Sequence, residues 1–187
     1  MGVLYLREGA PFQAQQTGGS QEDNRRAGTE NVAGIVGTAA ALKRAVDNRD
    51  AVGQHCKRLR DRLLDGILTR IADAHLNGHP VQRLPNNANI SFDYVEGESI
   101  LLNLDLLGVA ASSGSACASG HEEPSHVLLA IGLPGERAYG SVRFTVGEGN
   151  TDEDVDYVLH FLPGIIERLR KVSPLAGSRE QDRGASV

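Results

Sequence analysis

The chain has 187 residues, a formal net charge of −5, 40% hydrophobic residues and 23% charged residues, which is typical of an ordinary globular protein. The acidic balance argues against nucleic acid as the main partner, because a phosphate-binding face usually brings a basic excess. No apolar run approaches the ~20 residues of a membrane span. The N-terminus lacks a signal-peptide pattern, and the 2 cysteines form no disulfide framework. We therefore expect a cytoplasmic protein that does not enter a membrane.

The first part of the chain predicts a strand, a long loop and two helices. Residues 1–7, rich in Val, Leu and Tyr, are typical of a buried strand. Residues 8–30 are polar and glycine-rich without periodicity, which favours a functional loop. Apolar residues then recur at helical spacing over residues 31–47 and again from residue 52 to about residue 74. The polar run Asn48-Arg49-Asp50 is expected to separate these two helices.

The remainder predicts a small domain of short strands and helices. Its expected elements, in order, are strands at 81–84 and 89–92, a helix at 98–107 ended by Gly108, a strand at 109–112, a helix at 125–131, a strand at 141–146 and a helix that Thr151 caps. In the strand at 141–146, Val142 and Phe144 share one face and Arg143 points to the other. Residues 176–187 are polar and are expected to form a disordered tail.

Cys117 lies in a run of small residues, Ala110-Ala111-Ser112-Ser113-Gly114-Ser115-Ala116-Cys117-Ala118-Ser119-Gly120. Such a run leaves a thiol accessible, as a reactive cysteine requires, although an inert Gly/Ser loop fits the composition equally well. The other cysteine, Cys56, falls on an apolar helix face and is expected in the core. No cluster of Cys and His has zinc-ligand spacing, and His75 and His79 are expected in an exposed loop, so we expect no metal site.

Two further positions are candidates for binding anions. Thr29 follows Gly28 just before a predicted helix, where backbone N–H groups, a hydroxyl and two nearby arginines suit a phosphate. The alternative is that Thr29 or Asn31 simply caps the helix. Arg143 could grip a carboxylate bidentately, and the alternative is a surface charge on a solvated sheet face. The residues themselves leave both alternatives open.

Several segments together resemble the cysteine desulfurases, which are pyridoxal-phosphate enzymes of the class V aminotransferase group with the type I fold. In chain order these segments are Gly18-Gly19-Ser20-Gln21-Glu22, Arg26-Ala27-Gly28-Thr29-Glu30-Asn31, Ser112-Ser113-Gly114-Ser115-Ala116-Cys117, Glu123-Pro124-Ser125-His126-Val127-Leu128 and Val142-Arg143-Phe144. The Ser-Ser-Gly-Ser-Ala-Cys run with a later Glu-Pro-Ser-His is similar to the subgroup that supplies sulfur for iron–sulfur clusters. The resemblance covers roughly residues 1–175.

The resemblance implies a role for three residues. Cys117 would attack the sulfur of free L-cysteine and carry it as a persulfide while L-alanine is released. Arg143 matches the position that holds the substrate carboxylate. Thr29 matches the position that binds the cofactor phosphate, reaching it from the neighbouring subunit of a homodimer. An iron–sulfur scaffold or another sulfur acceptor would take the sulfur from Cys117.

One departure from the family pattern concerns the lysine that binds the cofactor covalently. In the family it lies in a Ser-x-His-Lys segment shortly before the strand expected here at residues 1–7. The chain contains only Lys43, Lys57 and Lys171, all in predicted helices. We therefore expect the C-terminal half of a desulfurase, of mixed α/β to α+β class. Its expected parts are a remnant of the large cofactor domain with the phosphate loop (1–30), a helical connector with the small α+β domain (31–175) and the tail.

Two functions follow as hypotheses. In the first, the chain is part of a pyridoxal-phosphate-dependent cysteine desulfurase whose lysine comes from elsewhere. In the second, it is a non-catalytic sulfur carrier or interaction module that docks on a full-length desulfurase or on a scaffold. A cofactor lysine supplied by a separate polypeptide would favour the first hypothesis. A persulfide that forms on Cys117 only when another desulfurase is present would favour the second hypothesis.

Overall fold

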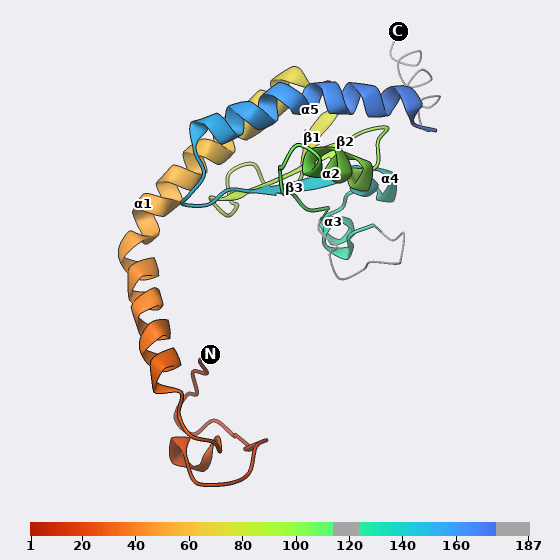
Figure 1. Cartoon of the computed structure of the whole chain (residues 1–187). Helices are drawn as coiled ribbons and strands as arrows, with labels where there is room; N and C mark the ends of the chain where they lie inside the picture. Colours follow the sequence, from red (N-terminus) through yellow and green to blue (C-terminus); the bar gives the residue numbers. More distant parts are fainter. Residues whose placement is uncertain (114–123, 175–187) are drawn as a thin grey trace. The chain divides into compact units, whose positions relative to one another are not determined.

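The computed structural model describes residues 1–113 and 124–174, and it divides the chain at Asp50 into two units. In chain order the elements are η1 (Glu22–Asn24), α1 (Val32–Arg70), β1 (Ala74–Leu76), β2 (Asn87–Phe92), α2 (Gly97–Asp105), α3 (His126–Ala130), α4 (Gly135–Tyr139), β3 (Ser141–Thr145) and α5 (Asp152–Val172) (Figure 1). Among the helices of these described ranges, none is both long enough and apolar enough to cross a bilayer.

The first unit contains η1 and the beginning of α1. Residues 1–7 form no strand, contrary to the sequence-based prediction, and Val3, Leu4 and Tyr5 are exposed. A strand requires a hydrogen-bonded neighbour, and none of the described strands pairs with this segment. The side chain of Asn31 caps α1 by accepting from the Gly34 N–H at 2.9 Å. Of the two residues considered as caps, Thr29 and Asn31, it is therefore Asn31 that caps the helix.

Helix α1 is continuous over 39 residues, so the predicted break at Asn48-Arg49-Asp50 is wrong. Asn and Asp lower helix propensity by only a few tenths of a kcal/mol, whereas a proline would have ended the helix. Its apolar residues Leu59, Leu63 and Ile67 recur every fourth position and are buried, as is Cys56, whose place in the core is confirmed. The helix ends at Arg70, before the unpredicted short strand β1.

The second unit is built on a three-stranded antiparallel sheet in the order β1-β2-β3. Figure 1 shows α5 and the C-terminal part of α1 running across one face of this sheet. The core between them contains apolar side chains of the helices and strands: Leu59, Leu63, Ile67, Ile90, Phe92, Ile100, Leu104, Val142, Phe144, Val155, Leu159, Leu162 and Ile166. Residues 81–84, predicted as a strand, lie outside the sheet.

Both ends of α5 are fixed by polar interactions. Thr151 forms the predicted cap as a capping box with Asp154. The carboxylate of Asp152 accepts hydrogen bonds from Arg58 and Arg62 of α1, and these hold the pKa of Asp152 below its ordinary value of 3.8. At the other end, the buried guanidinium of Arg170 donates to three backbone carbonyls of the segment around β1 and β2, those of Ala72, Asp73 and Asp93.

Gly97 allows α2 to approach the start of β3. A Cβ at this position would lie 2.6 Å from the Ser141 carbonyl oxygen and 3.0 Å from that of Tyr139. Gly97→Ala is therefore expected to lower the free energy of unfolding by about 1–3 kcal/mol, measured by urea denaturation. Gly53→Ala is the matched control: nothing lies within 4 Å of its Cβ position in α1, and alanine should stabilise a helix interior by about 0.5–1 kcal/mol. If Gly97→Ala had the same free energy of unfolding as the wild type, the close approach of α2 to β3 would be contradicted.

Candidate functional site

Arg143 lies on the face of the sheet opposite the core. Its neighbours along β3, Val142 and Phe144, are buried at 0% and 5% exposure, while the Arg143 side chain is exposed. The alternation predicted for this strand is therefore confirmed. The Arg143 side chain is exposed, and among the described residues its guanidinium donates to the Ser112 hydroxyl and to no carboxylate.

The same face of the sheet carries a network of neutral polar side chains. The side-chain amide of Asn77 donates to Asn89 Oδ1 at 2.6 Å, to Ser91 Oγ at 2.8 Å and to Ser141 Oγ at 3.2 Å. Ser91 and Ser141 are buried, and their hydroxyls lie 2.7 Å apart. Asn89 is directly opposite Arg143 in the β2–β3 register. Arg143 thus lies at the exposed end of a face whose buried part is a hydrogen-bonded polar network.

Ser112 is the partner of Arg143 on its other side. The two residues form an isolated antiparallel bridge, in which the Arg143 N–H donates to the Ser112 carbonyl at 2.6 Å and the Ser112 N–H donates back at 3.1 Å. The strand predicted at 109–112 is reduced to this one bridge. Cys117, five residues further along the sequence, lies outside the described residues, and its predicted role stays a prediction.

Thr29 belongs to the first unit, whereas Arg143 belongs to the second. It is exposed and follows Gly28, whose φ of 107° is a conformation that favours glycine. Because Asn31 caps α1, the Thr29 hydroxyl is not committed to that cap. A small cavity of about 160 Å³ in the same unit is lined by Gly18, Gly19 and other loop residues up to Ala27, but not by Thr29. The phosphate-binding role of Thr29 stays a prediction.

The three lysines have surface roles. Lys43, Lys57 and Lys171 are 76%, 63% and 73% exposed and pair with a carboxylate one helical turn away, at 2.8, 3.2 and 3.4 Å. The prediction that all three lie in helices is confirmed. A lysine that binds an aldehyde cofactor must lose its proton, which burial promotes and an exposed ion pair opposes.

Sequence reasoning missed His75, which was expected in an exposed loop. It lies in β1, and its Nε2 is 2.7 Å from Asp93 Oδ2. The other oxygen of Asp93 accepts from Arg137 of α4 at 3.1 Å. Asp93 thereby ties α4, a helix that was not predicted, to the end of β2. No local sequence signal reveals this contact, because its three members come from distant segments.

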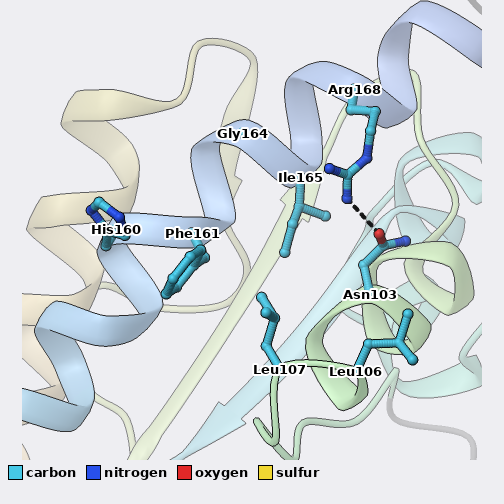
Figure 2. A pocket seen from close by; sticks show the side chains of 8 residues that line it. All are labelled: Asn103, Leu106, Leu107, His160, Phe161, Gly164, Ile165 and Arg168. Carbon is cyan, nitrogen blue, oxygen red and sulfur yellow. Dashed lines mark hydrogen bonds between the residues drawn. The ribbon is translucent and has the colours of Figure 1, made fainter.

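A second cavity, of about 360 Å³, lies between α2 and α5 (Figure 2). Its walls are mainly apolar, formed by Leu106, Leu107, Phe161 and Ile165. At one end Arg168 donates to Asn103 Oδ1 at 2.7 Å, as the dashed line in Figure 2 shows. Neither Arg143 nor Thr29 lines this cavity, so it is separate from the positions that the sequence singled out.

Comparison with known families gives the identification. The family model of class V aminotransferases matches residues 2–158. The chain belongs to the class V aminotransferase family. This confirms the family group that the sequence motifs indicated.

Within this family the chain is similar to cysteine desulfurases. It is 50% identical to cysteine desulfurase IscS 1 of Archaeoglobus fulgidus over 94% of its own length and 46% of the relative. It is 53% identical to cysteine desulfurase IscS of Dictyoglomus turgidum, over 93% of the chain and 44% of the relative. A solved NifS-like protein matches with a TM-score of 0.75 and 32% identity, over 88% of this chain and 42% of that one.

The class V aminotransferase chain therefore spans less than half the length of these relatives. The predicted fold class is confirmed, since a mixed helical and small-sheet fold is what it shares with the NifS-like protein. The comparisons leave the roles of Cys117, Thr29 and Arg143 as predictions.

Arg143→Ala is expected to weaken the binding of a small amino-acid carboxylate by about ten- to a hundredfold, because a hydrogen bond to a charged group contributes about 1.5–3 kcal/mol. L-Alanine is the probe, and the NMR signals of the Ser112 and Asn89 backbone amides, which flank Arg143, report binding. Arg143→Lys should fall between the wild type and Arg143→Ala, because lysine keeps the charge but not the bidentate geometry.

Thr145→Ala is the control, since Thr145 lies on the same face two residues further along β3. It should bind L-alanine as the wild type does. All three variants should keep the free energy of unfolding within about 0.5 kcal/mol, because the changed side chains are exposed. Equal affinities for the wild type and Arg143→Ala would contradict the carboxylate site.

Proposed function

We propose that this chain provides the sulfur-accepting part of a pyridoxal-phosphate-dependent cysteine desulfurase. In this reaction sulfur is removed from free L-cysteine, L-alanine is released and Cys117 carries the sulfur as a persulfide. The main support is the pairing of Ser112 with Arg143, which joins the candidate carboxylate site to the segment that leads to Cys117. Five residues of chain span at most about 18 Å. This connection keeps Cys117 within reach of an amino acid whose carboxylate is bound by Arg143.

Each residue has a step that its chemistry supports. The Arg143 guanidinium binds and orients the substrate carboxylate. The Cys117 thiolate attacks the substrate sulfur, so that an S–S bond forms as the substrate C–S bond breaks. The electron pair of the broken bond stays with the substrate carbon, which takes a proton and becomes the methyl group of alanine. When bound, pyridoxal phosphate supplies the electron sink for this cleavage.

The residues of this chain fit one end of that cofactor only. Thr29, with the Gly28 backbone and Arg26 nearby, offers donors for its phosphate group. None of the three lysines is suited to bind the cofactor covalently, because all three are exposed and ion-paired. We infer that a segment outside these 187 residues supplies the lysine, and we assign no covalent cofactor step to this chain.

The first unit supports an assembly with another polypeptide. The N-terminal part of α1 exposes several large apolar side chains, namely Val32, Ile35, Val36, Leu42 and Val46. Exposed apolar stripes of this kind are typical of interaction surfaces. We propose a homodimer in which Thr29 binds the cofactor phosphate of the neighbouring subunit. An iron–sulfur scaffold or another acceptor would take the sulfur. We also propose a cytoplasmic location, where a reducing environment keeps Cys117 as a free thiol.

The second candidate function is a sulfur carrier or interaction module that makes no sulfur itself. The observation that favours it is the surface position of all three lysines, since a chain without a cofactor lysine could still accept sulfur from a complete desulfurase. The two functions differ in the source of the sulfur and share Cys117 as its acceptor.

The test of the proposed function is alanine release from L-cysteine with pyridoxal phosphate and a reductant. The chain alone is expected to show no turnover. Addition of a separate N-terminal segment that carries the cofactor lysine in a Ser-x-His-Lys motif should restore it, and Cys117→Ala should abolish it because the attacking thiolate is lost. Cys56→Ala is the control and should keep turnover, since Cys56 is buried in the core.

Turnover by the chain alone would contradict the assignment of the lysine to another segment. No turnover with the added segment, together with sulfur on Cys117 only beside a complete desulfurase, would favour the carrier over the enzyme.

A further inference from the structure

Arg143 and Ser112 are held opposite each other by their backbones. Each donates its N–H to the carbonyl of the other, at 2.6 and 3.1 Å. Such a hydrogen-bonded antiparallel pair places both side chains on the same face of the sheet. The Ser112 hydroxyl is therefore fixed beside the Arg143 side chain by main-chain geometry.

The two side chains also interact directly. Arg143 Nη2 donates to Ser112 Oγ at 3.3 Å. An exposed arginine samples many rotamers and loses that freedom when it binds an anion. A hydroxyl attached to a fixed backbone selects a subset of those rotamers before the anion arrives, which lowers the entropic cost of binding.

The neighbour on the other strand does not offer the same support. Asn89 is directly opposite Arg143 in β2, but its Oδ1 already accepts a hydrogen bond from Asn77 at 2.6 Å. That oxygen has a second lone pair, but among the described residues the Arg143 guanidinium donates to Ser112 Oγ and not to Asn89. Of the two cross-strand neighbours of Arg143, Ser112 is the one whose side-chain oxygen accepts a hydrogen bond from the guanidinium.

We propose that Ser112 is a positioning residue for Arg143: its hydroxyl holds the guanidinium in the orientation that receives a carboxylate. The guanidinium keeps its other N–H groups for the ligand, because a single Nη donates to the serine. The identification of this carboxylate as that of the substrate rests on the proposed function. The positioning of the guanidinium is a property of this chain alone.

The test uses the full chain with isotope-labelled arginine and follows the Arg143 guanidinium by NMR. Ser112→Ala should speed the exchange of its Nη environments by about two- to tenfold, the effect of one long, solvent-exposed hydrogen bond. The affinity for L-alanine should fall by a similar factor. Ser112→Thr keeps the hydroxyl and should restore both values. Ser113→Ala removes the adjacent serine hydroxyl and should change neither.

Identical Arg143 exchange in the wild type and Ser112→Ala would overturn the proposal, as would an equal effect of Ser113→Ala. If Ser112→Ala changes the exchange while no form of the chain binds L-alanine, the positioning stands and the proposed carboxylate function fails. A loss of stability cannot imitate the expected result, because Ser112→Ala leaves the two backbone hydrogen bonds of the bridge in place and Ser112→Thr must restore the signal.

Discussion

The antiparallel register between β2 and β3 is the constraint on which the rest of the second unit depends. It pairs Ile90 with Val142 on the core face and Asn89 with Arg143 on the opposite face. A shift of one residue would move Arg143 into the core and Val142 out of it, which the apolar side chains of α1 and α5 packed against this face do not allow. Burial of a few apolar side chains thus determines where the one guanidinium on β3 points.

This register also assembles the polar face. Ser91 pairs with Ser141, and Asn77 bridges both serines and Asn89, so the surface beside Arg143 is cross-linked by hydrogen bonds. At its edge Ser112 adds one more pair to β3. A site on such a surface is preorganised, because its groups are held before a ligand binds.

The chemistry expected of a desulfurase is divided among separate parts. The second unit holds Arg143 and the segment that leads to Cys117, and the first unit holds Thr29. Because the lysines are exposed and ion-paired, we propose that a segment outside these 187 residues attaches the cofactor covalently. The exposed apolar stripe of α1 supports an assembly in which such a segment, or a second subunit, covers it.

Local patterns in the sequence were enough to predict part of this structure. The alternation around Arg143, the Thr151 cap and the burial of Cys56 each depend on neighbours within one turn or one strand. The strand expected at residues 1–7 and the break expected at Asn48-Arg49-Asp50 were wrong, because pairing partners and helix continuity depend on more than composition. The Ser112–Arg143 bridge joins residues 31 positions apart, and its register cannot be derived from either segment alone.

The most direct measurement is the location of sulfur after reaction with two thiol compounds. The chain, combined with a lysine-bearing segment and pyridoxal phosphate, is incubated with sulfur-labelled L-cysteine or with sulfur-labelled cysteamine, which lacks the carboxylate. Peptide mass spectrometry then locates the label. The expected result is a persulfide on Cys117 from L-cysteine, little from cysteamine and none on Cys56. Equal labelling by both compounds, or label on Cys56, would contradict a site in which Arg143 holds the carboxylate while Cys117 takes the sulfur.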